Sequence, residues 1–100
     1  MKLEFNAKGE LYDIGCIETV INSYQQGNAT VEELFLARNV CKGKIKYFSK
    51  FKKNAGMIYT HLLIYIDGLR DNDVDKMRAS YNAYEKYFKK VFGHMVGGAK

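Results

Sequence analysis

The chain has 100 residues, of which 47% are hydrophobic and 27% are charged, and its formal net charge is +5. These values are typical of one globular domain with one modest core, and they exclude a collagen-like or disordered chain. The longest aliphatic and aromatic run, Leu62–Ile66, is far too short to cross a membrane.

The compartment and the cofactor content follow from the cysteines and histidines. Cys16 and Cys41 are the only cysteines, and the first residues lack the apolar core of a secretory signal. We therefore expect a cytoplasmic protein with two reduced, buried thiols. No Cys or His pair has the spacing of a zinc site, so we expect no metal and no cofactor. His61 lies in an apolar segment, where we expect an interior residue with satisfied hydrogen bonds.

The N-terminal segment, residues 2–14, fits two structures. Lys2–Asn6 alternates polar and apolar residues as a strand does, and Asn6–Gly9 resembles the turn of a bulged hairpin. The alternative is a helix that begins near Glu10. The alternation slightly favours a short β-hairpin at the N-terminus.

Two helices follow in the first half of the chain. The apolar spacing predicts a helix over residues 14–26, with Asp13 as its N-cap and Gly27 at its end. Thr30 and Glu33 form the pattern of a capping box, which predicts the start of a second helix. Its apolar stripe continues through Phe48, so we place residues 31–53 on one helix.

The second half of the chain predicts two more helices. Asn54–Gly56 has the composition of a break, and Met57–Leu69 is apolar nearly all round, as a buried central helix is; a strand over Met57–Ile66 is the alternative. After a turn, a last helix covers residues 73–92, and the glycine-rich residues 93–100 are expected to be a flexible tail. The expected fold is mainly α, a compact bundle of about four helices in a single domain, residues 1–92.

The lysines supply the clearest functional signal. Six lie between Lys42 and Lys53, and no Asp or Glu occurs between Glu33 and Asp67. An AT-rich genome explains many lysines by composition alone, but it explains the missing acids less well. On a helical wheel Lys42, Lys46, Ser49, Lys50 and Lys53 share an arc of about 100°, opposite the apolar stripe. This arrangement indicates an outward-facing cationic surface.

Residues 30–53 also resemble the helix-turn-helix of TetR-type repressors, through Thr30-Val-Glu-Glu-Leu and Asn39-Val-Cys-Lys-Gly-Lys-Ile. The resemblance implies a break at Asn39 and a groove-reading helix over Lys42–Lys53. Two positions depart from the pattern. Phe35 stands where a small residue lets the helices cross, and Arg38 stands where a buried apolar residue belongs.

These patterns favour a small, non-enzymatic binding or regulatory protein whose lysine-rich helix face docks on a polyanion, most simply a nucleic-acid backbone. The candidate contacts are Arg38, Lys42, Lys46, Lys50, Lys53, Lys86, Lys89 and Lys90. Tyr47 and Tyr87 are candidates for stacking on bases. No arrangement of side chains points to catalysis.

Two other kinds of partner fit the same surface. One is an acidic protein, with the chain acting as an inhibitor or adaptor of the type found among phage and mobile-element accessory proteins. The other is a small anionic nucleotide held in a pocket. The wide aromatic face of the last helix also suits a homodimer.

Overall fold

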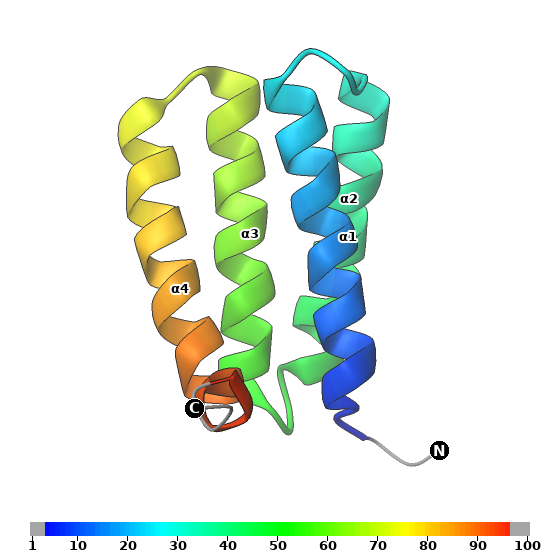
Figure 1. The fold of residues 1–100 in the computed structure, drawn as a ribbon, viewed down its shortest axis with the longest axis vertical. Helices are drawn as coiled ribbons and strands as arrows, with labels where there is room; N and C mark the ends of the chain where they lie inside the picture. The colour runs from blue at the N-terminus through cyan, green and yellow to red at the C-terminus, as the bar shows by residue number, and fades with distance from the viewer. Residues whose placement is uncertain (1–3, 97–100) are drawn as a thin grey trace.

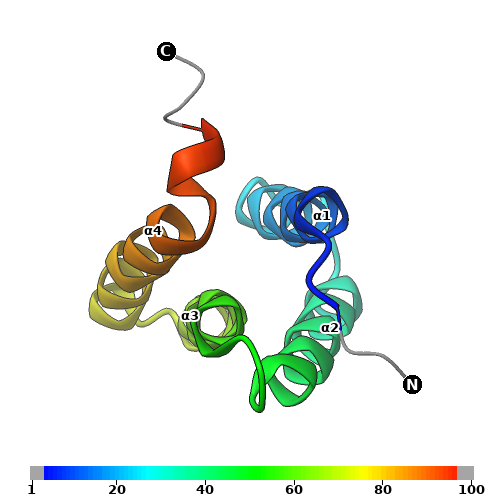
Figure 2. The same cartoon turned by 90° about the horizontal axis from the view of Figure 1, so that it is seen from below.

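The computed structural model describes residues 4–96, which form four helices. They are α1 (Ala7–Gln25), α2 (Val31–Phe48), α3 (Lys53–Asp71) and α4 (Val74–Val96). The helices run alternately up and down the bundle (Figure 1). In the end-on view, α1 and α4 are further apart than the other pairs of adjacent helices (Figure 2). The prediction of a mainly α bundle of about four helices is confirmed. None of the described helices combines the length and the apolarity that crossing a bilayer needs.

The prediction of an N-terminal hairpin is wrong, because the structure has a helix from Ala7 onward. The Asn6 side chain caps α1 by accepting a hydrogen bond from the Gly9 amide at 3.2 Å. Asp13, predicted as the cap, lies inside the helix. The reason is that a helix from Ala7 buries Glu10 together with three isoleucines on one face, and this burial outweighs the local turn signal. The start of the predicted strand, residues 2–3, lies outside the described residues.

The predicted connection between the first two helices is confirmed. Gly27 has φ 79°, the left-handed conformation that ends many helices. The Asn28 amide donates to the Ser23 carbonyl at 2.7 Å across this helix end. Thr30 and Glu33 form the capping box, with the Glu33 amide donating to the Thr30 hydroxyl at 3.1 Å and the Thr30 amide donating to Glu33 at 2.8 Å.

The second helix ends earlier than predicted. α2 stops at Phe48, and the Lys52 amide donates to the Phe48 carbonyl at 3.0 Å across the following turn. Phe48 is fully buried, and a Cβ on Gly56 would lie 3.5 Å from the Phe48 Cβ. The predicted break at Asn54–Gly56 is wrong, because α3 begins at Lys53 and Gly56 lies buried in its first turns, against Phe48. α2 also runs unbroken through Asn39, so the helix-turn-helix arrangement is wrong.

The last two helices agree with the prediction except at their ends. α3 is helical throughout, so the strand alternative is wrong, and it extends to Asp71 before Asn72 adopts φ 55°. Asp73 caps α4 by accepting from the Lys76 amide at 3.1 Å. The helix continues over residues 93–96, which were expected to belong to the tail, and residues 97–100 lie outside the described residues.

The core is built from all four helices. Among its most buried side chains are Ile14, Leu34, Phe48, Ile58, Tyr59, Ile66 and Phe92. Cys41 is buried, as expected, and burial raises the pKa of its thiol to about 12. The expectation for Cys16 is wrong, because it is exposed on α1 one position before the buried Ile17.

Candidate nucleic-acid interface

The up-and-down topology sorts the charges into two ends. After residue 15 the sequence alternates between acidic and basic segments, and the antiparallel helices bring the two basic segments, 40–61 and 85–96, to the same end as residues 4–15. We call described residues 4–15, 40–61 and 85–96 the basic end, which is the lower half of Figure 1. It carries ten lysines against four acids, whereas the opposite, acidic end carries four cations against seven acids. The described cations of the basic end are all lysines, and all three arginines lie in the acidic end.

Two of the three arginines take part in ion pairs, and most of the lysines do not. Arg38 pairs with Asp67 at 2.8 Å, and Arg70 pairs with Asp71 at 3.0 Å. At the basic end only Lys44 has a described carboxylate within 4.0 Å of its amine. Arg38, one of the predicted polyanion contacts, is therefore occupied by a partner inside the protein. Nine lysines of the basic end remain available to an external anion.

The predicted lysine stripe is divided among three structural elements. Lys42 and Lys46 are exposed on α2, Lys50 lies in the turn, and Lys53 begins α3. The single-helix stripe is wrong because the chain reverses after Phe48. The reversal nevertheless keeps these lysines at one end of the bundle, where the end of α4 adds Lys86, Lys89 and Lys90.

Three lysines of the basic end, Lys52, Lys53 and Lys90, line one cavity of about 360 Å³ between the start of α3 and the end of α4. Its lining consists of Phe51, Lys52, Lys53, Asn54, Lys90 and Val91. No side chain caps the α3 N-terminus, and no acid lies in its first turn. The amide hydrogens at this helix end add partial positive charge to the three lysines. The lining of this cavity thus contains three lysines and no acid.

Aromatic rings accompany the lysines. Tyr87 stacks on His61, with ring centroids 5.6 Å apart and planes 13° apart. The amines of Lys86 and Lys90 lie 5.9 and 5.2 Å from the Tyr87 ring centre. Burial lowers the pKa of His61, and its buried Nδ1 has no hydrogen-bond partner, so the expectation of a satisfied histidine is wrong.

The other stacking candidate, Tyr47, is held by the N-terminal segment. Its hydroxyl donates to the Glu4 carbonyl and accepts from the Glu4 amide, each at 3.2 Å. Its ring packs edge-on against Phe48 and Phe51. Tyr47 thus has contacts within the protein that a base would have to replace.

A charged network below the lysine surface was missed by the sequence analysis. Glu10 is only 8% exposed, and its carboxylate accepts from the Tyr59 hydroxyl at 2.5 Å and from Lys44 at 3.0 Å. Lys44 also pairs with Asp13 at 2.7 Å. Partial burial opposes the charge of Lys44, but hydrogen bonds to Asp13 and Glu10 outweigh it and raise the Lys44 pKa. Burial and Glu10 together raise the pKa of Tyr59.

A signal for this network was present in the sequence. Glu10 has the helical spacing of Ile14, Ile17 and Ile21, and Lys44 falls within the apolar arc of the second helix. Two opposite charges on two apolar faces indicate a buried ion pair once those faces pack together. α1 therefore supplies the carboxylates that are missing from the sequence around Lys44.

No group of three or more His, Cys, Asp or Glu among the described residues is arranged to hold a metal ion. No known family model matches the sequence, and neither the curated proteins nor the solved structures include a match.

Proposed function

We propose that the protein binds nucleic-acid backbones through the basic end, without performing a reaction on them. The observation that carries this proposal is the segregation of nine unpaired lysines to one end of the bundle. Holding like charges together destabilises a fold unless they meet an anion. The cost suggests that this end has a polyanionic partner.

The chemistry of lysine favours the backbone over the bases. Ammonium groups contact phosphates as point charges and release condensed counterions, which provides affinity independent of sequence. Base-specific contacts are most often made by the forked guanidinium group of arginine, and all three arginines lie in the acidic end. Tyr87, flanked by Lys86 and Lys90, provides a ring beside the lysines for an unpaired base.

The test compares two triple variants that lose the same charge. Lys52→Gln, Lys53→Gln and Lys90→Gln together remove the lysines of the cavity, and Arg70→Gln, Lys76→Gln and Arg78→Gln remove three cations from the acidic end. Affinity for a random-sequence duplex and a random single strand is measured against salt concentration. Each phosphate contact contributes about 0.9 to the duplex salt slope, so the first variant loses about 2–3 from the slope and at least about tenfold in affinity at low salt.

The control variant should keep its slope, and both variants should keep their helical circular dichroism. Equal affinity of the two variants, or no measurable binding by the unmodified protein, contradicts the proposal. Capture of an acidic protein that survives nuclease treatment and depends on the same lysines would identify the alternative partner. Binding of a mononucleotide without binding of either polymer would identify the nucleotide pocket instead.

A further inference from the structure

The side of the bundle where α1 faces α4 has a cavity of the opposite chemical character. It measures about 170 Å³ and contains three tyrosines and one carboxylate but no lysine. Its lining consists of Glu18, Ile21, Asn22, Leu62, Tyr65, Tyr81 and Tyr84. The ring centroids of Tyr65 and Tyr81 lie 6.0 Å apart, and those of Tyr81 and Tyr84 lie 5.8 Å apart. We call it the tyrosine cavity.

Glu18 gives the tyrosine cavity its charge. The Tyr84 hydroxyl donates to the Glu18 carboxylate at 2.5 Å, which holds the carboxylate at the wall. No described Lys, Arg or His nitrogen lies within 4.0 Å of it. A half-buried carboxylate with a hydrogen bond but no cation has unused capacity for a positive partner.

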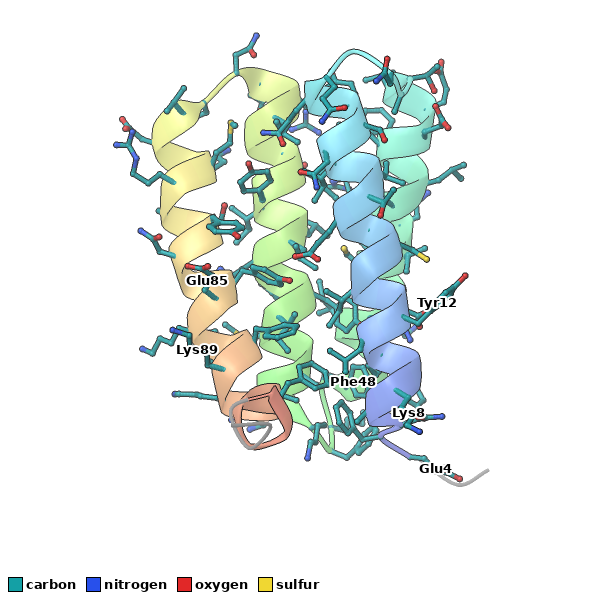
Figure 3. All side chains as sticks on the ribbon, in the orientation of Figure 1. Glu4, Lys8, Tyr12, Phe48, Glu85 and Lys89 are labelled. Carbon is teal, nitrogen blue, oxygen red and sulfur yellow. The ribbon has the colours of Figure 1, made fainter. Side chains whose placement is uncertain are left out.

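A second cavity continues from the first. It measures about 230 Å³, shares Glu18, Tyr81 and Tyr84 with the tyrosine cavity, and adds Glu85, Phe88 and Lys89. Burial and the negative charges of Glu85 and Glu18 raise the pKa of Tyr81, as a negative local potential does. Lys89 lies one turn from Glu85 on α4 (Figure 3), and no described carboxylate lies within 4.0 Å of its amine. The two cavities together thus have two carboxylates and one lysine in their lining, although the chain as a whole is positive.

We propose that the tyrosine cavity binds an organic cation, the ammonium or guanidinium group of a small molecule or side chain. The faces of aromatic rings attract cations, and the attraction grows as water is excluded. Glu18 then supplies the counter-charge, and the ring of Tyr81 covers the cation from the α4 side. A simple anion is disfavoured by Glu18, and a purely apolar ligand leaves the carboxylate without a partner.

The direct test titrates the protein with three probes, followed by NMR or calorimetry. The probes are choline, methylguanidinium, and 3,3-dimethylbutanol, which has the shape of choline without its charge. Binding of choline alone supports a quaternary-ammonium site, and binding of methylguanidinium supports a guanidinium site. Binding of the neutral alcohol as strongly as either cation, or of no probe at all, overturns the proposal.

Variants locate the binding. Tyr81 is 45% exposed, so Tyr81→Leu should leave the fold intact while weakening cation binding by about fivefold or more. Glu18→Gln should also weaken cation binding, because it removes the counter-charge. Tyr12→Leu is the matched control, because Tyr12 is 72% exposed and points away from the bundle (Figure 3). Equal affinity of Tyr81→Leu and Tyr12→Leu contradicts the assignment. Nucleic-acid binding by Tyr81→Leu should be unchanged, so this proposal and the function proposed above are tested separately.

Discussion

Lys44 and its neighbours Lys42 and Lys46 belong to one helix, yet they have opposite surroundings. Lys44 points inward to Glu10 and Asp13 and is 22% exposed, whereas Lys42 and Lys46 are exposed and have no described carboxylate within 4.0 Å. The same side chain is therefore part of the internal structure at one position and part of a charged surface two residues away.

The difference shows how one fold uses its lysines in two ways. Lys44 loses contact with water, but the two carboxylates of α1 compensate for that loss, so we expect it to stabilise the packing of α1 on α2. The exposed lysines keep their water and repel one another, so we expect them to contribute affinity for an anion and no stability. Four experiments test this division, in order of decreasing expected effect.

Replacing Lys44 tests the internal half of the comparison. Lys44→Ala leaves Glu10 buried without its cation, and we expect it to lower the free energy of unfolding by about 2–3 kcal/mol, somewhat less than for a fully buried pair. Lys42→Ala on the same helix should change it by less than about 0.5 kcal/mol. Urea denaturation measures both. Equal stability of the two variants would remove the distinction between the two kinds of lysine.

The hydroxyl of Tyr59 is the other donor to Glu10. Tyr59→Phe keeps the ring in the core but leaves the carboxylate with one partner fewer, so we expect a loss of about 1–2 kcal/mol in unfolding free energy. Tyr12→Phe removes a hydroxyl from an exposed ring and should have almost no effect. If thermal unfolding of the two variants coincided, the Tyr59 contact would not be stabilising.

Neutralising exposed lysines should act in the opposite direction. Lys42→Gln, Lys46→Gln and Lys50→Gln together relieve repulsion, and we expect a gain of about 0.5 kcal/mol in unfolding free energy at low salt. The gain should disappear in high salt, because ions screen exposed charges. Arg70→Gln, Lys76→Gln and Arg78→Gln remove cations from among acids and should give no gain. A gain of equal size in both variants would show that net charge, and not the basic end, is responsible.

Lowering the pH adds one more charge to the basic end, with the smallest effect. Because burial holds the pKa of His61 below its ordinary value of 6.5, the unfolded chain binds a proton there before the folded protein does. Stability should therefore fall slightly as the pH drops through 6.5 toward the folded pKa, and His61→Gln should reduce that fall. Denaturation of both proteins at pH 7.5 and 5.5 measures the difference. Identical pH dependence would show that His61 does not contribute.

Patterns within single helices predicted much of this fold. The capping box at Thr30 and the left-handed end at Gly27 each depend on neighbouring residues, and each was predicted. The errors lie where packing decides. Asn6 begins a helix because the face that follows it is buried, and Gly56 lies inside α3, where it is buried against Phe48.

The sequence identified most of the candidate lysines, and the structure showed on which helices and turns they lie. Seven lysines of the basic end were predicted as contacts, and Lys52 was not. Arg38 was also predicted, but it lies at the acidic end and is paired with Asp67. The tyrosine cavity and the Glu10 network were not predicted, because each joins residues from helices that are distant in the sequence. Local patterns contain no information on which faces will meet.

The sequence by itself determined the helical content, the helix ends that have a local capping signal and the excess of lysine, because capping, periodicity and charge are properties of residues near one another in the chain. Only the tertiary structure decided which lysines are available to an external anion and which are paired inside the protein. Antiparallel packing brought the two basic segments, 40–61 and 85–96, to one end, and it carried Glu10 and Asp13 to Lys44 across more than thirty residues of sequence. A charge acquires its role from its neighbours in space, and those neighbours are set by the burial of apolar faces.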